Sequence, residues 1–209
     1  TTTVQEATAR GVLDAIDILV PVINYLDDKD GAQFPGEQRS RYDEFLASSP
    51  KRELWTYQSC MSHGCGGTVD FGNPSAADVY FTGWPSYTID ASAVRNRAME
   101  WLSFRYGLTG ELYYETVQGY GENPWVQQAA FGGNGDGTFF YPGQPSRIGG
   151  TRHIPVASIR LKMIREGMED YEYLAKLASL GFGNEARAIA TGLFPRAFEG
   201  IVGAAVGTP

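Results

Sequence analysis

Three segments with the pattern of β-strands alternate along this chain with three that have the pattern of α-helices, and this order constrains the fold most. The expected strands are residues 15–22, 53–59 and 111–117. The expected helices are residues 35–48, 92–106 and 155–180, with a shorter one over residues 184–193. No two strands are close enough in sequence to form a hairpin, so the order predicts parallel βα units and an α/β fold.

The ends of the expected helices carry local signals. Asp90 or Ser92 would cap the N-terminus of the second helix, and Gly107 would end it. Pro155 would occupy the first turn of the last long helix. The connection from residue 118 to about 154 is expected to be a long loop.

The number of strands is too small for a closed barrel. A (β/α)8 TIM barrel has eight strands and about 250 residues. This chain of 209 residues has three expected strands, or four if the opening TTTV ends another. With 43% hydrophobic residues it is long enough to bury a core. We therefore expect residues 1–209 to form one domain, the C-terminal half of a TIM barrel whose N-terminal portion lies outside this chain.

Charge and composition narrow the class of partner. The net charge of -7 argues against a nucleic-acid or anionic-membrane surface, because phosphate binding requires clustered Lys and Arg. No apolar run approaches the roughly 18 residues that a spanning helix needs. The 12 Tyr, 11 Phe and 4 Trp suit stacking on sugar rings and equally an aromatic core. A neutral partner is expected, and no cofactor.

The two cysteines lie close together, at Cys60 and Cys65, with His63 between them. This spacing suits a small disulfide loop, and two buried thiols are the alternative. A zinc site would have to recruit both cysteines together with His63 and His153, at spacings unlike those of the known zinc modules. No metal site is therefore expected.

The stretch NGDGTFFYPG, residues 134–143, has three interpretations: a calcium loop, a tight turn, or a fragment of a larger signature. A calcium loop needs more oxygen ligands than Asn134 and Asp136 supply, because Gly135 and Gly137 leave gaps. Asn-Gly and Asp-Gly are strong turn signals. A turn followed by a short strand is expected, and calcium remains a minor alternative.

Several segments, taken in order, resemble one known catalytic domain. They are IDILVP (16–21), LWTYQSC (54–60), FRYG (104–107), GELYYETV (110–117), NPW (123–125), NGDGTFFYPG (134–143) and SIRLKMIREGMEDYEYL (158–174). The domain is the one called domain of unknown function 4091, which is similar to glycoside hydrolase family 123. The resemblance covers nearly the whole chain, and its last two segments are the most specific.

The resemblance implies a TIM-barrel glycosidase, typically bacterial and secreted or periplasmic. Characterised members release N-acetyl-β-galactosamine and are retaining enzymes with substrate assistance, in which a Glu protonates the leaving oxygen and an adjacent Asp orients the substrate's acetamido group. Such enzymes are exceptions to the two-carboxylate nucleophile scheme.

An adjacent Asp–Glu pair at a strand end is missing from this sequence. Asp43-Glu44 falls on an amphipathic helix, and the reversed pair Glu169-Asp170 falls within the last long helix. In the family the catalytic pair precedes the part that corresponds to Thr1. We therefore expect the pair to lie outside this chain, and no catalytic residue within it.

Binding residues are expected where strands end, because active sites in such barrels lie at the carboxyl ends of the strands. The candidates for contact with a sugar are Glu115, Tyr114, Tyr120, Trp125, Tyr57 and Asn24. The alternative for Glu115 is a salt bridge to Arg95 or Arg97, and the aromatic residues would look the same if they only filled a core. Asp17, inside the first expected strand, is more consistent with a buried ion pair.

The resulting hypothesis is part of a glycoside hydrolase, a substrate-assisted retaining N-acetyl-β-hexosaminidase, completed by the missing half of the barrel. The alternative is a non-catalytic carbohydrate-binding or scaffold half-barrel that closes as a homo-oligomer, since open sheet edges must be covered.

Overall fold

The structure is a computed structural model. It describes residues 2–59, 62, 64, 79–121, 123–130 and 133–199. Cys60, His63 and Cys65 lie outside the described residues, so the expected disulfide loop is not among the features below.

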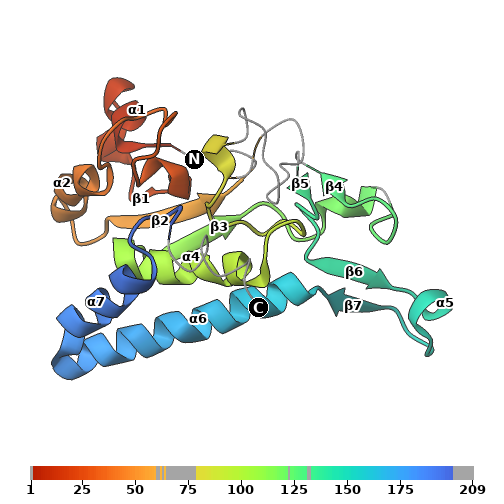
Figure 1. The fold of residues 1–209 in the computed structure, drawn as a ribbon. Coiled ribbons are helices and arrows are strands. Elements are labelled where there is room, and N and C mark those ends of the chain that lie inside the picture. The colour runs from red at the N-terminus through yellow and green to blue at the C-terminus, as the bar shows by residue number, and fades with distance from the viewer. Residues whose placement is uncertain are drawn as a thin grey trace.

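A parallel sheet of order β1-β2-β3 lies at the centre of the fold (Figure 1). It consists of β1 (Ile18–Leu19), β2 (Glu53–Gln58) and β3 (Gly110–Tyr113). Both pairings are parallel, which confirms the βα units predicted from the sequence. In the described part of the chain β3 has β2 as its neighbour on one edge and no strand on the other.

The first strand is much shorter than predicted. Residues 13–15 form the 3-10 helix η1 (Leu13–Ala15) before it, and Asp17 is exposed, so the prediction of a buried ion pair at Asp17 was wrong. Pro21 interrupts the ladder because it has no N–H to donate, although its carbonyl still accepts from the backbone nitrogen of Tyr57 at 3.0 Å.

Helix α4 (Ala93–Tyr106) covers one face of the sheet, and α6 (Ile159–Leu177) packs against α4 from outside (Figure 1). Ser92 caps α4 by accepting from the backbone nitrogen of Arg95, and Gly107 ends it at φ 65°, as predicted. The π-helix η6 (Ala178–Phe182) turns the chain into α7 (Gly183–Leu193), which confirms the last predicted helix.

The remaining helices are short and surround the sheet. They are α1 (Val4–Ala9), η2 (Ile23–Tyr25), η3 (Arg39–Tyr42), α2 (Asp43–Ala47), η4 (Val79–Phe81) and η5 (Gln118–Gly121). The helix predicted over residues 35–48 is thus confirmed only over η3 and α2. No helix in the described ranges is both long and apolar enough to cross a membrane.

The long loop predicted after β3 contains two small antiparallel pairs instead. One is β4 (Ala129–Ala130) with β5 (Gly133–Asn134), and the other is β6 (Phe140–Gly143) with β7 (Ile154–Ala157), joined through the short helix α5 (Pro145–Ile148). Pro155 therefore lies in β7, and the prediction that it starts a helix was wrong. Helix α6 begins after Ser158, whose side chain accepts from the backbone nitrogen of Leu161.

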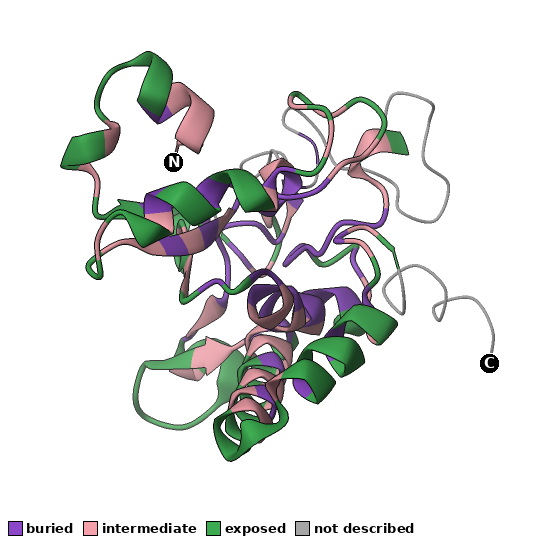
Figure 2. Ribbon diagram, turned by 90° about the vertical axis from the view of Figure 1, so that its left-hand side faces the viewer, coloured by how far each residue is buried: buried purple, intermediate pink, exposed green. Residues whose placement is uncertain are grey.

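The core lies between the sheet and α4, and buried residues gather there while exposed ones cover the outside (Figure 2). Leu19 and Leu54 of the sheet meet Met99 and Leu102 of α4, and all four are at most 1% exposed. Burial of each such side chain stabilises the fold by roughly 1.5–3 kcal/mol.

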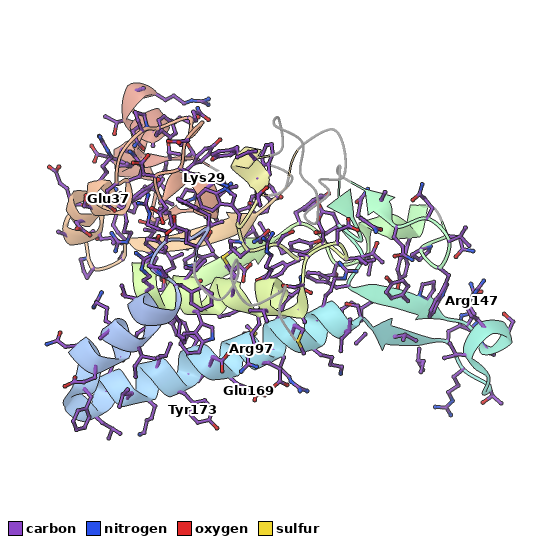
Figure 3. All side chains as sticks on the ribbon, viewed as in Figure 1. Lys29, Glu37, Arg97, Arg147, Glu169 and Tyr173 are labelled. Atoms are coloured by element: carbon purple, nitrogen blue, oxygen red, sulfur yellow. The ribbon has the colours of Figure 1, made fainter. Side chains whose placement is uncertain are left out.

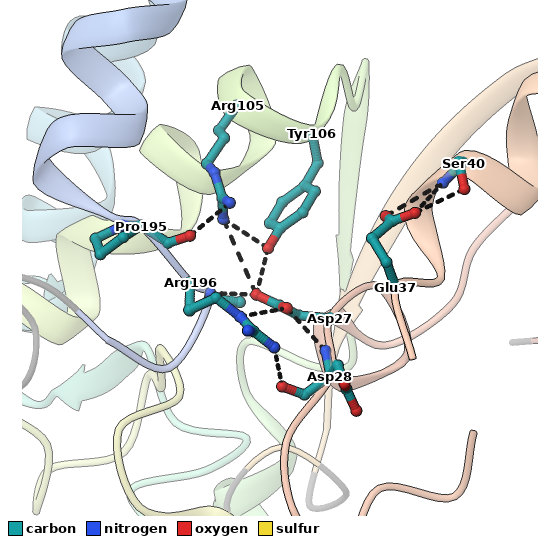
Figure 4. Close-up of polar contacts among 9 residues, drawn as sticks. Asp27, Asp28, Glu37, Ser40, Arg105, Tyr106, Pro195 and Arg196 are labelled. Atoms are coloured by element: carbon teal, nitrogen blue, oxygen red, sulfur yellow. Dashed lines mark hydrogen bonds and ion pairs between the residues drawn. The ribbon is translucent and has the colours of Figure 1, made fainter. Parts of the chain in front are cut away.

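Asp27, just after η2, ties the C-terminal segment to the core (Figure 4). Its buried carboxylate accepts from the Tyr106 hydroxyl at 2.6 Å, from Arg196 Nε at 2.9 Å and from the backbone nitrogen of Ala197 at 2.7 Å. Segments far apart in sequence are thereby held at one point beside β1.

Candidate functional site

The register of the sheet divides its side chains between a covered face and an open face. Leu54, Thr56 and Gln58 alternate along β2 and are buried on the side of α4. The open face consists of Trp55, Tyr57, Leu112 and Tyr114, with Tyr57 opposite Leu112. Leu112 is 44% and Tyr114 57% exposed. Parallel strands are ordinarily covered on both faces, and the described residues cover this face only in part.

Tyr57 on β2 and Tyr114 just after β3 lie on the same face of the sheet, where these strands end. Burial raises the pKa of Tyr57, and the negative charges of Asp136 and Tyr114 raise it further. Tyr57 and Tyr114 were both predicted to reach this edge, and the structure brings them together there. Asp136 was not predicted as a neighbour.

Glu115 follows Tyr114 at the same edge and is half-exposed. It makes no hydrogen bond or ion pair with any described residue. Arg97 instead pairs with Asp170, at 2.5 Å between Arg97 Nε and Asp170 Oδ2, so the alternative salt bridge to Arg97 was wrong. Arg95 is buried and is not a partner of Glu115 either. The Glu115 carboxylate is thus left for an external donor.

A turn over residues 134–137 closes over the end of β3. Gly135 and Gly137 have φ of 80° and 70°, which only glycine adopts easily, and this confirms the predicted turn. Asp136 is buried and accepts from the Tyr113 hydroxyl at 2.6 Å, while that hydroxyl accepts from the backbone nitrogen of Gly137 at 2.8 Å. One carboxylate oxygen of Asp136 is therefore used inside the protein. Among the described residues, no three Asp, Glu, His or Cys side chains are grouped to hold a metal ion.

Arg160, near the start of α6, holds this turn from below. Its buried guanidinium donates to the carbonyls of Tyr87 at 2.8 Å, of Gly135 at 2.6 Å and of Thr138. An arginine that satisfies three backbone carbonyls fixes their position. Arg160 belongs to the segment SIRLKMIREGMEDYEYL, but its contact with these carbonyls was not predicted from the sequence.

A second feature lies beyond η5, where a pocket of about 420 Å³ opens. It is lined by Tyr120, Asn123, Pro124, Trp125, Pro142, Gln144 and Arg147. Tyr120 and Trp125 were predicted as sugar-contacting residues, and the structure brings them together here. The chain between β3 and η5 connects the pocket to the strand ends, and Gly119 is held to the turn by donation from its backbone nitrogen to the Gly137 carbonyl at 3.1 Å.

Trp125 is fixed within this pocket. Its indole N–H donates to the Pro142 carbonyl at 3.0 Å, and its ring lies 4.9 Å from the Tyr141 ring and 5.5 Å from Arg147 Cζ. Arg147, Gln144 and Asn123 were not predicted. Arg147 lies on α5, at the end of the molecule away from α7 (Figure 3).

Asn24 is the predicted residue that the structure buries. It is 2% exposed in η2, and its amide makes no hydrogen bond with a described residue. It offers no exposed polar atom at the strand ends.

Two carboxyl groups share one tyrosine on the covered face of the sheet. The Tyr87 hydroxyl lies 2.8 Å from Glu111 Oε2 and 3.4 Å from Glu100 Oε1. Burial raises the pKa of Glu111 to about 7, and burial together with the charge of Glu111 raises that of Glu100 well above its ordinary value. This pair therefore holds a proton near neutral pH, and it faces the helices rather than the open face.

Part of this chain is similar in sequence to a known catalytic domain, and its fold is similar to that of a solved structure. Residues 77–177 match the family model of the glycoside hydrolase 123 catalytic domain. No curated protein matches the chain. A family 123 glycoside hydrolase from Clostridium perfringens, whose structure was analysed for the details of glycolipid glycan hydrolysis, is similar in fold. The TM-score is 0.60 at 16% identity over 92% of this chain, and the chain spans 28% of that protein. The turn over residues 134–137, β3 and the whole of α6 lie within the matched segment, so residues 77–177 carry the catalytic-domain pattern of glycoside hydrolase family 123.

Proposed function

We propose that this chain forms one wall of the sugar-binding site of a glycoside hydrolase. The observation that carries the proposal is the Glu115 carboxylate, which is half-exposed and has no partner among the described residues. It follows Tyr114 directly after β3, and the neighbouring strand β2 carries Tyr57. An acceptor for hydroxyl groups next to ring faces is the arrangement that a pyranose needs, because one face of the sugar is apolar and its rim is polar.

The parallel sheet is proposed to be the C-terminal half of a (β/α)8 barrel. Leu112 and Tyr114 expose apolar surface on the open face, and each Å² of such surface contributes about 25 cal/mol when it is covered. Further strands beside β3 would cover that face and pair the free edge. The 28% share of the similar hydrolase that this chain spans is consistent with a larger whole.

The reaction proposed for the whole protein is the retaining removal of an N-acetyl-β-hexosamine, with N-acetylgalactosamine as the first candidate sugar. The substrate's acetamido oxygen attacks the anomeric carbon, and an adjacent Asp and Glu outside this chain orient it and protonate the leaving oxygen. Secretion or export to a bacterial periplasm is part of the same proposal, by resemblance to the family.

The test is turnover of a chromogenic N-acetyl-β-galactosaminide by the purified chain. The proposal predicts no release of the chromophore above the spontaneous rate. Normal turnover would overturn the assignment of the catalytic acids to another segment. A stable dimer that binds glycans and gains no activity from any added segment would favour the alternative, a non-catalytic half-barrel.

A further inference from the structure

We propose that the pocket beside Trp125 binds the acidic group, carboxylate or sulfate, of a glycan, with Arg147 as its principal ligand. This inference rests on the proposed function, because it takes a glycan to be the partner. It adds the class of substituent that the glycan carries.

The charge of Arg147 is not neutralised by any residue that the structure describes. Its guanidinium makes no hydrogen bond or ion pair with these residues, and it contacts the Trp125 ring, 5.5 Å from Cζ to the centroid. Arg160 also contacts a ring but is buried, and it uses its N–H groups on backbone carbonyls. The N–H groups of Arg147, in contrast, donate to no described residue.

Arg147 Cζ lies over the Trp125 ring, 5.5 Å from the centroid. A cation–π contact of this kind uses the charge of the guanidinium, and its five N–H donors remain able to bind an acceptor. The Trp125 ring is itself held by the Pro142 carbonyl and by Tyr141, so the guanidinium rests on a fixed support. A positioned, planar fork of donors is the group that binds carboxylate and sulfate in bidentate fashion.

The remaining polar groups of the pocket add donors. The Tyr120 hydroxyl and the amide of Gln144 have no hydrogen-bond partner in the described part of the chain. The amide of Asn123 uses only its oxygen there, which accepts from the Trp125 backbone nitrogen at 3.1 Å. None of the described residues that line the pocket is acidic. A lining with one cation and several donors favours an acceptor-rich anion over a neutral sugar.

The segment that contributes Pro142, Gln144 and Arg147 to the pocket has the same bias. The chain as a whole has a net charge of -7, yet there is no Asp or Glu between Asp136 and Glu166, a stretch with four arginines and one lysine. The segment that contributes Tyr120 and Asn123 carries one acid in the sequence, Glu122.

The experiment is calorimetric titration of the chain with three related oligosaccharides at one ionic strength. The first is neutral and ends in β-linked N-acetylgalactosamine, and the other two are the same oligosaccharide bearing a sialic acid or a sulfate. Wild type is expected to bind at least one acidic form about tenfold more tightly than the neutral one, since hydrogen bonds to charged groups are worth about that factor. Which acidic form is preferred identifies the anion.

Two variants test the role of Arg147. Arg147→Gln is expected to bind the acidic and neutral forms equally, whereas Arg152→Gln is the matched control, because Arg152 is exposed on the same β6–β7 connection and does not line the pocket. If both variants lost the preference for the acidic form equally, the preference would come from long-range charge and not from the pocket, and the inference would be overturned.

The outcomes also separate the two proposals. Equal binding of all three oligosaccharides by wild type overturns the inference and leaves the proposed function standing. No binding of any of them overturns both.

Discussion

The hydroxyl of Tyr87 donates to Glu111 at 2.8 Å and thereby holds a carboxyl group whose Oε1 is buried without a partner among the described residues. Glu100 lies on the other side of the same hydroxyl, at 3.4 Å. A single hydroxyl proton cannot satisfy two buried carboxylates, so the arrangement favours the protonated form of one of them.

This arrangement predicts that stability falls as pH rises. The pKa of Glu111 is raised from 4.5 to about 7 in the folded chain. The folded protein therefore retains a proton that the unfolded chain releases. The stabilisation that the Glu111 carboxyl group contributes below pH 4.5 is lost as the pH rises to about 7.

Glu111→Gln should remove this loss while keeping an acceptor for Tyr87. The free energy of unfolding of variant and wild type is measured by urea denaturation at pH 4.5 and at pH 8. The difference, variant minus wild type, is expected to be larger at pH 8 by on the order of 2–3 kcal/mol. Glu172→Gln is the control, because Glu172 is an exposed acid lining the same small pocket as Glu111. A pH dependence in Glu111→Gln equal to that of wild type would contradict the buried pair.

Gly167 of α6 marks the closest approach of α6 to α4. A Cβ added there would lie 2.7 Å from the Arg97 carbonyl and 2.4 Å from Glu100 Oε2. Gly167→Ala should therefore destabilise the fold by roughly 1–3 kcal/mol, because the helices must separate, although alanine is the better helix former.

Gly192 of α7 supplies the matched control. An added Cβ meets no atom within 4 Å there, so Gly192→Ala should stabilise the chain by about 0.5–1 kcal/mol. Thermal denaturation of the two variants measures both effects. A gain in stability for Gly167→Ala would show that α4 and α6 are not packed this closely.

Asp170 joins α6 to α4 through three donors. It accepts from Arg97 Nε at 2.5 Å, from Arg97 Nη2 at 2.6 Å and from the Trp101 indole at 2.7 Å. Asp170→Ala should lower the free energy of unfolding by about 1–2 kcal/mol, a value that allows for the partial exposure of Arg97.

The neighbouring acid Glu169 provides the comparison for Asp170 (Figure 3). It is exposed and pairs with Arg165 at 3.5 Å, so Glu169→Ala should change the unfolding free energy by less than about 0.5 kcal/mol. Equal effects of the two substitutions in urea denaturation would argue against the contact between α4 and α6.

The helices with complete local signals could be predicted from the sequence. Ser92 and Gly107 define the two ends of α4, because an N-cap and a left-handed glycine each act on residues only a few positions away. The β6–β7 pair could not be predicted in this way, because it depends on contact between distant segments. Pro142 lies opposite Pro155 in it, a pairing that needs no N–H from either residue, and prolines in isolation indicate a turn or a helix start.

The candidate site likewise has residues that local signals identify and residues that only contacts between distant segments bring together. Tyr57, Tyr114 and Glu115 could be found because parallel strands end at one edge of a sheet. Arg147 and Gln144 lie more than 15 residues after Trp125, in a stretch that looked like an open loop, and only the β6–β7 pair brings them to it. The absence of acids from residues 137–165 was the one sequence signal that pointed there.

The most direct test of the central claim is calorimetric titration of the chain with a disaccharide ending in β-linked N-acetylgalactosamine, for wild type and Glu115→Gln. Glu172→Gln, at an exposed glutamate of α6 remote from the strand ends, is the control. The account predicts saturable binding by wild type and by the control, and binding about tenfold weaker or more for Glu115→Gln, through the loss of a charged acceptor. The absence of binding by wild type, or equal affinity in Glu115→Gln, would contradict it.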